Sequence, residues 1–309
     1  MPSTIIAGYD GRDHASDALA LGLLLARTTS ATLLVVCAYP EDPLGHGGAL
    51  ADLGTSARHD AERAIEQARA VVGDGGGVAV EFHALAGAKP SQVLHDFAEQ
   101  REATLIVVGA THHGAAVRLL TGSTPERVLD GSPCPVAVAP LGYAEANQDH
   151  AVDGTLGGAG GTPLTVAVAF DDSPESARAL DAAADFARRA GGGRLRVVTA
   201  VNSAVGAYPP LDPTAYAEIA NLARETAQER LDKALAGLEG LTVDAAVLDG
   251  DPAIVLLEDS EHDDVLFTGS GAKGPFRRVL MGSVSTTLLR EAACPVVIVP
   301  RPSGEGSKR

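Results

Sequence analysis

Short β-branched apolar runs alternate along this chain with amphipathic stretches of helical period. In the first half the apolar runs predict strands at 4–9, 32–38, 78–85, 104–109 and 135–139. The amphipathic stretches between them predict helices near 14–27, 56–72, 90–100 and 123–130. The second half repeats the pattern, with predicted strands at 165–170, 194–201, 242–248, 265–269 and 295–299. Continuous apolar strands separated by helices predict parallel sheets covered on both faces.

Several motifs recur at a nearly constant spacing of about 160 residues. Asp10 recurs as Asp171, the glycine-rich stretch 109–123 recurs as 269–283, and "CPVAVAP" from Cys134 recurs as "CPVVIVP" from Cys294. One register for an acid, a loop and a strand indicates two copies of one fold. We therefore predict two tandem α/β doubly wound domains, each a five-stranded parallel sheet flanked by helices. The predicted boundaries are 1–142 for the first domain, 143–162 for a Gly-rich linker, 163–302 for the second domain and 303–309 for a tail.

Composition narrows the class of protein. A chain of 309 residues has room for two domains with cores of their own, and aromatic residues make up only 4% of it, so the cores must be built from Ala, Val, Leu and Ile. The net charge of -16 argues against a broad nucleic-acid or acidic-membrane surface. With no leader-like N-terminus and no long apolar span, we expect a cytoplasmic protein that does not enter membranes. Three scattered cysteines indicate buried thiols, and no histidine spacing predicts a metal site.

Three features of each half are expected to meet beyond the carboxyl ends of the strands, where such sheets bind ligands. The first is the acid that closes strand one, Asp10 or Asp171, which could accept hydrogen bonds from a ribose hydroxyl or an adenine amine. The alternative is that Asp172 and Ser173 simply cap the next helix, which explains Ser173 but leaves Asp171 without a role.

The other two features favour an anion. Glycine-rich loops follow strand four at 109–114 and 269–274, and glycine lets backbone N–H groups approach phosphates. Gly-Ser pairs then open a helix, whose free N–H groups and dipole attract negative charge. These pairs are Gly122-Ser123 and Gly282-Ser283, with Ser285 offering another hydroxyl. Cations at Arg118, Lys273 and Arg278 could neutralise phosphate or could simply face solvent.

The loops match neither a Walker nor a dinucleotide motif. They resemble the universal stress protein family, whose hallmark is G-x2-G-x9-G-[ST] after strand four. "FDDSPESARAL", "GDPA" and "VLMGSVS" in the second half are similar to that family's sequences, as is "CPVVIVP". The resemblance implies an adenine nucleotide alpha hydrolase-like fold. In the ATP-binding branch of the family it also implies ATP with a divalent ion such as Mg²⁺.

Carried over from the family, the implied ATP-binding residues of the second domain are Asp171, Ala200, Thr268, Gly269, Ala272, Gly274, Arg278, Gly282, Ser283, Val284 and Ser285. Those of the first domain are Asp10, Ala38, Val108, Gly109, Gly114, Gly122, Ser123 and Thr124. The hallmark's second glycine is replaced by His112 and by Ala272, and Pro125 stands in the place of Ser285. These departures favour the second site over the first.

In the family the fifth strand pairs with its counterpart, so the repeated CPV strands suggest a pairing of the two domains within one chain. A homodimer is also compatible with the sequence. The function that follows is an ATP-binding regulatory protein of the stress response. The alternatives are a protein-interaction module without nucleotide and a slow ATPase or nucleotidyl transferase. The enzyme is the weaker alternative, because no general base, nucleophile elbow or metal box stands out.

Overall fold

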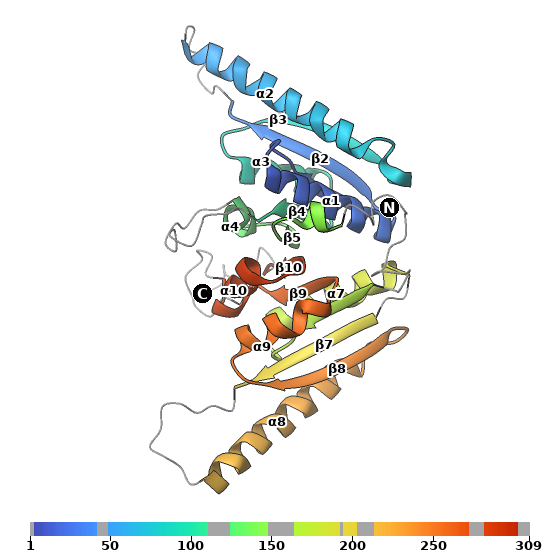
Figure 1. The fold of residues 1–309 in the computed structure, drawn as a ribbon, viewed down its shortest axis with the longest axis vertical. Helices are drawn as coiled ribbons and strands as arrows, with labels where there is room; N and C mark the ends of the chain where they lie inside the picture. Colours follow the sequence, from blue (N-terminus) through green and yellow to red (C-terminus); the bar gives the residue numbers. More distant parts are fainter. Residues whose placement is uncertain are drawn as a thin grey trace. The chain divides into compact units, whose positions relative to one another are not determined.

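The computed structural model describes residues 3–41, 49–110, 124–147, 164–191, 194–202, 213–271 and 281–301. Its described residues fall into two compact units, one up to residue 147 and the other from residue 164. Each unit is a parallel sheet of five strands flanked by helices (Figure 1). The predicted fold class, two tandem doubly wound α/β domains, is confirmed.

In the first domain the strand order is β3-β2-β1-β4-β5, and neighbouring strands are parallel. The strands are β1 (Thr4–Gly8), β2 (Thr32–Tyr39), β3 (Val80–Ala86), β4 (Leu105–Gly109) and β5 (Val136–Ala139). The helices are α1 (Asp13–Thr29), α2 (Ala49–Val72), the 3₁₀ turn η1 (Gly75–Gly77), α3 (Pro90–Gln100), α4 (Thr124–Leu129) and α5 (Tyr143–Ala146). Since the order reverses beside β1, the ends of β1 and β4 flank the crevice where a ligand is expected.

The second domain repeats this arrangement as β8-β7-β6-β9-β10. Its strands are β6 (Thr165–Ala169), β7 (Arg194–Val201), β8 (Thr242–Asp249), β9 (Val265–Gly269) and β10 (Val296–Val299). Its helices are α7 (Pro174–Arg189), α8 (Pro213–Leu235), α9 (Pro252–Asp259), the 3₁₀ turn η2 (Ser260–His262) and α10 (Ser283–Glu291). The equivalent crevice lies at the ends of β6 and β9.

The central strands form the cores. Ile6 and Ile106 in the first domain and Leu266 and Ile298 in the second are fully buried. Such strands are buried on both faces, which explains why uninterrupted apolar runs located them so well. No helix in the described ranges combines the length and the apolar character that a membrane crossing requires.

Helix α5 occupies the start of the segment predicted as linker. The N–H groups of Gly142 and Ala144 donate hydrogen bonds of 3.1 and 2.8 Å to the buried carboxylate of Asp17 on α1. Tyr143 is buried beside them. The chain after β5 is therefore anchored on α1, because a buried carboxylate needs such donors. Residues 148–163 of the predicted linker and the tail from 303 lie outside the described residues.

All three cysteines are free and buried, as the sequence predicts. Burial raises the pKa of Cys37 to about 11 and the pKa values of Cys134 and Cys294 to about 12. Since the thiolate is the reactive form, these thiols are unreactive near neutral pH.

An ion cluster around the buried carboxylate of Asp263 lies near the amino ends of the strands of the second domain, away from the crevice. The Arg196 guanidinium donates to Asp263 Oδ1 at 2.9 Å and also to Asp259. The side chain of Asp263 is 1% exposed, and its Oδ2 has no hydrogen-bond partner among the described residues. Burial raises the pKa of Asp263 to about 6, although the nearby charge of Arg196 opposes this shift.

This cluster predicts a pH-dependent stability. The folded protein binds a proton at Asp263 more tightly than the unfolded chain, whose carboxyl has the ordinary pKa of 3.8. The resulting stabilisation is complete below pH about 4 and is lost as the pH rises through about 6. We expect the free energy of unfolding of the wild type, relative to Asp263→Asn, to fall by up to about 3 kcal/mol between pH 4 and 7. Urea unfolding of both proteins across this range measures it, and a pH-independent difference would contradict it.

Candidate functional site

A pocket of about 550 Å³ opens at the carboxyl ends of β6 and β7 in the second domain. Helix α8 forms its remaining wall. Its lining residues come from three segments: Phe170, Asp171 and Asp172; Thr199, Ala200, Val201 and Asn202; and Ile219, Leu222, Ala223, Thr226, Ala227 and Arg230. Two residues predicted from the sequence, Asp171 and Ala200, therefore line one pocket at the expected edge of the sheet.

Asp171 also belongs to the turn that starts helix α7. Its Oδ1 accepts a hydrogen bond of 3.1 Å from the Ser173 N–H, and the Ser173 Oγ accepts one of 3.1 Å from the Ser176 N–H. Ser173 is thus the N-cap, as predicted. The expectation that capping leaves Asp171 without a role is wrong, since its carboxylate holds the Ser173 N–H in place. The carboxylate is nevertheless exposed and part of the pocket wall.

The glycine that ends β4 or β9 is required by helix packing. A Cβ on Gly269 would lie 2.7 Å from the Glu175 carbonyl carbon and 2.8 Å from its oxygen, and one on Gly109 would lie 1.8 Å from the His14 carbonyl oxygen. The first turn of α7 or α1 comes this close in both domains. The hallmark's first glycine therefore has a packing role, whereas the sequence alone suggested only a role in phosphate binding.

The start of the second glycine loop meets the start of α10. The Gly282 N–H donates to the Ser270 carbonyl at 3.1 Å, and Ser285 Oγ donates to the Gly269 carbonyl at 2.9 Å. Gly271 has a φ of 64°, and a Cβ there would lie 3.2 Å from the Gly282 Cα. The structure thus brings Gly269, Gly282 and Ser285 together, as predicted. The positive-φ residue Gly271, one position before Ala272, was missed, although glycine itself was the signal.

Three further predicted residues of the second domain lie on β9 and α10. Thr268 is buried in β9, while Ser283 and Val284 begin α10, whose N-cap is Gly282. Their contact with a ligand stays a prediction. The predicted residues Gly114, Gly122, Ser123, Ala272, Gly274 and Arg278 lie outside the described residues.

At the equivalent crevice of the first domain, the acid has different neighbours. Asp10 Oδ1 accepts from the Arg12 N–H at 3.1 Å, and Asp10 Oδ2 lies 3.4 Å from His14 Nε2 and 3.7 Å from Arg12 Nε. A Cβ on Gly11 would lie 3.4 Å from the Ala64 Cβ and 3.1 Å from Gln67 Oε1, so helix α2 packs beside the turn that follows β1.

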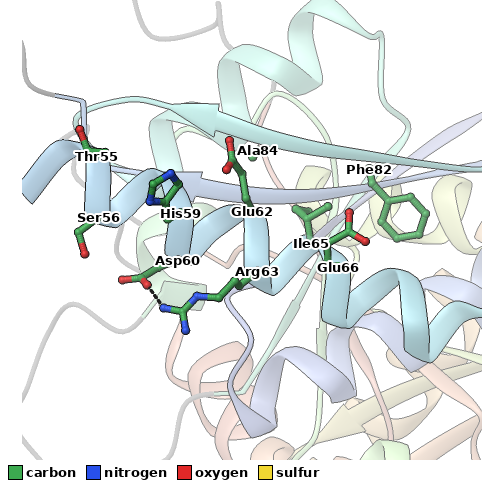
Figure 2. Close-up of a pocket in the computed structure, with 10 residues that line it drawn as sticks. All are labelled: Thr55, Ser56, His59, Asp60, Glu62, Arg63, Ile65, Glu66, Phe82 and Ala84. Atoms are coloured by element: carbon green, nitrogen blue, oxygen red, sulfur yellow. Dashed lines mark hydrogen bonds and ion pairs between the residues drawn. The ribbon is translucent and has the colours of Figure 1, made fainter.

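Among the other predicted residues of the first domain, Ala38 and Val108 lie at the ends of β2 and β4, and Thr124 begins α4. A wide groove of about 1100 Å³ does exist in this domain, between α2 and the edge strand β3. Figure 2 shows its lining, which combines polar side chains of α2 such as His59 and Glu62 with Phe82 and Ala84 of β3. None of the predicted site residues lines this groove.

The model of the universal stress protein family matches residues 1–140 and 164–300. The chain belongs to the universal stress protein family. A universal stress protein of Mycolicibacterium smegmatis is 29% identical over 86% of this chain and 83% of its own length.

The tandem arrangement is shared by relatives. Universal stress protein Rv2319c of Mycobacterium tuberculosis is 28% identical over 96% of this chain and 99% of its own length. A crystal structure of a universal stress protein from Archaeoglobus fulgidus has a TM-score of 0.67 at 20% identity, covering 96% of this chain and 98% of that one. This universal stress protein therefore has the two-domain fold over nearly its whole length.

Proposed function

We propose that this universal stress protein binds an adenine nucleotide in the pocket of its second domain and acts as a regulatory protein of the stress response. The observation that carries the proposal is the pocket that contains Asp171 and Ala200 at the carboxyl ends of β6 and β7, beside the switch point between β6 and β9. Asp171 would accept a hydrogen bond from a ribose hydroxyl.

The lining suits a planar base. Phe170, Leu222 and Ala227 supply apolar surface from the strand end and from α8. Thr199 also lines the pocket, and its buried hydroxyl has no hydrogen-bond partner within the described residues. Leaving such a group unpaired costs about 1–3 kcal/mol, which a polar atom of the ligand would offset.

The phosphates would extend to the N-terminus of α10. Ser283 and Val284 place their N–H groups at the positive end of a nine-residue helix. In the described ranges no group of three His, Cys, Asp or Glu side chains could hold a metal ion. We therefore propose Mg²⁺ only as a companion of the phosphates.

One ligand per chain is the expected stoichiometry, because in the first domain His112 replaces the hallmark's second glycine and Pro125 stands in the place of Ser285. Titration calorimetry with ATP should give about one site per chain. Asp171→Ala should weaken binding by about 10-fold or more, since it removes a charge-assisted hydrogen bond. The matched variant Asp10→Ala should leave the affinity unchanged. Absence of heat with ATP, ADP and adenosine from a folded protein would defeat the proposal.

Two alternatives give different results. A slow ATPase would release phosphate above the buffer background, and Asp171→Ala would abolish that turnover. An interaction module would bind a protein partner with unchanged affinity in variants that lose nucleotide. Its supporting observation is the exposed apolar surface of α8, where Leu222 is 65% and Ile219 is 45% exposed.

We infer pairing of the two domains through the CPV strands, further association into a homodimer, and a cytoplasmic location. Sedimentation equilibrium of the whole chain would test the homodimer.

A further inference from the structure

Exposed apolar side chains line one wall of the second-domain pocket. Ile219 and Leu222 stand one turn apart on α8 and both line the pocket, yet they are 45% and 65% exposed. Among the described residues, the other large apolar side chains with such exposure are Val71, Leu141 and Ile254, and none of these lines this pocket. Single exposed apolar side chains are common on proteins, but a neighbouring pair on a concave wall indicates a surface for an apolar part of a ligand.

The same face of α8 becomes polar toward the C-terminal half of the helix. Four residues at spacings of three and four share this face and line the pocket: Ile219, Leu222, Thr226 and Arg230. The Thr226 hydroxyl donates to the Leu222 carbonyl at 2.8 Å, so it is used within the helix. Arg230 Nε lies 3.6 Å from Asp172 Oδ2. The wall therefore runs from an apolar end to a charged end.

The apolar end of this wall lies far from the candidate sugar-binding acid. Residues 219 and 230 are separated by about 16 Å along a helix axis. The charged end is the one beside Asp172, the residue that follows that acid. The Arg224 guanidinium donates to Asp249 Oδ2 at 2.9 Å, which places the next turn of α8 beside the end of β8. The apolar end is therefore part of the folded domain, and a ligand held by the acid must extend along α8 to reach it.

We propose that Ile219 and Leu222 form an apolar subsite of the pocket, which binds a hydrocarbon substituent on the base of an adenine nucleoside or nucleotide. This assignment rests on the function proposed above, because it takes the sugar to lie at Asp171. The exocyclic amine of adenine is on the edge of the base remote from the sugar, so a substituent there extends toward the apolar end of the wall. Covering the two side chains removes apolar surface from water, which favours binding.

The dye anilinonaphthalene sulfonate, which fluoresces on apolar surfaces, tests the subsite without any nucleotide. Leu222→Asn nearly keeps the size of the side chain but makes it polar, and it should weaken dye binding by about 10-fold or more. Leu222→Met stays apolar and should remain within about threefold of the wild type. The matched control is Val71→Asn, because Val71 on α2 is equally exposed at 65% but lies outside the pocket. This control should bind the dye like the wild type.

Adenosine that carries a benzyl group on its exocyclic amine tests the class of ligand. In titration calorimetry the wild type should bind this benzyladenosine about 10-fold more tightly than adenosine, because the phenyl ring covers apolar surface of α8. The preference should disappear in Leu222→Asn and persist in Val71→Asn. Circular dichroism establishes that each variant is folded.

Failure of the subsite and failure of the proposed function give different results. The subsite would be overturned if the wild type bound benzyladenosine no more tightly than adenosine, or if the folded Leu222→Asn variant kept the full dye affinity. Binding of ATP in either case would leave the proposed function standing. Dye binding that depends on Leu222, in a protein that binds neither ATP nor either nucleoside, would support the apolar subsite and defeat the proposed function instead.

Discussion

Gly282→Val is expected to abolish nucleotide binding, with a loss of affinity of about 100-fold or more. A Cβ at Gly282 would lie 2.9 Å from the Gly271 carbonyl oxygen and 3.3 Å from the Gly271 Cα. Both partners are backbone, so the loop and the start of α10 must move apart to admit the side chain. The N–H groups of Ser283 and Val284 would then leave their common site, and charge-assisted bonds to phosphate depend on that placement.

Calorimetry with ATP and with adenosine measures this effect and locates it. Because the change lies at the phosphate end, the loss for ATP should exceed the loss for adenosine. Gly237→Val makes the same chemical change at an exposed glycine whose Cβ would meet nothing within 4 Å, and it should bind like the wild type. Undiminished ATP affinity in Gly282→Val would show that α10 does not contact the ligand. Binding of a protein partner by the nucleotide-free variant would indicate an interaction module.

Gly109→Ala is expected to destabilise the first domain by about 3 kcal/mol or more. Its Cβ would lie 1.8 Å from the His14 carbonyl oxygen and 2.7 Å from the carbonyl carbon, so α1 cannot keep its position on the sheet. Overpacking against side chains usually costs about 1–3 kcal/mol, and here the obstacle is a helix backbone that cannot rotate away.

Hydrogen exchange resolves the effect by domain. Amides of β1 and β4 should lose protection in Gly109→Ala, while those of β6 and β9 serve as the internal reference. The matched Gly237→Ala should change neither set, because its methyl group meets no neighbour. Equal protection of β1 and β4 in Gly109→Ala and in the wild type would contradict the close approach of α1.

Local patterns in the chain were reliable guides to the fold. The predicted strand at 165–170 is β6 at Thr165–Ala169, and the predicted helix at 90–100 is α3 at Pro90–Gln100. Helix α2 begins at Ala49, whereas the prediction began at residue 56. The earlier turns were missed because Gly54 and the polar residues around it interrupt the apolar pattern of the sequence. Helix α5 was not predicted, since its anchor is the distant Asp17 and its own four residues carry no periodic signal.

Candidate site residues were predictable where the chemistry is local. The Asp171 carboxylate, the Ser173 cap and the Gly282-Ser283 helix start follow from neighbouring residues and the direction of the chain. The need for glycine at 109 and 269 could not be derived this way, because it arises where α1 or α7 crosses the strand end.

From the sequence alone came the repeat, the order of strands and helices, and the edge of each sheet where a ligand would bind, because periodicity and chain direction are properties of consecutive residues. Only the folded chain decided which of the candidate residues line a common pocket, as Asp171 and Ala200 do with helix α8. That outcome depends on contacts between segments far apart in the sequence, such as the close approach of α7 to Gly269, which periodicity does not record.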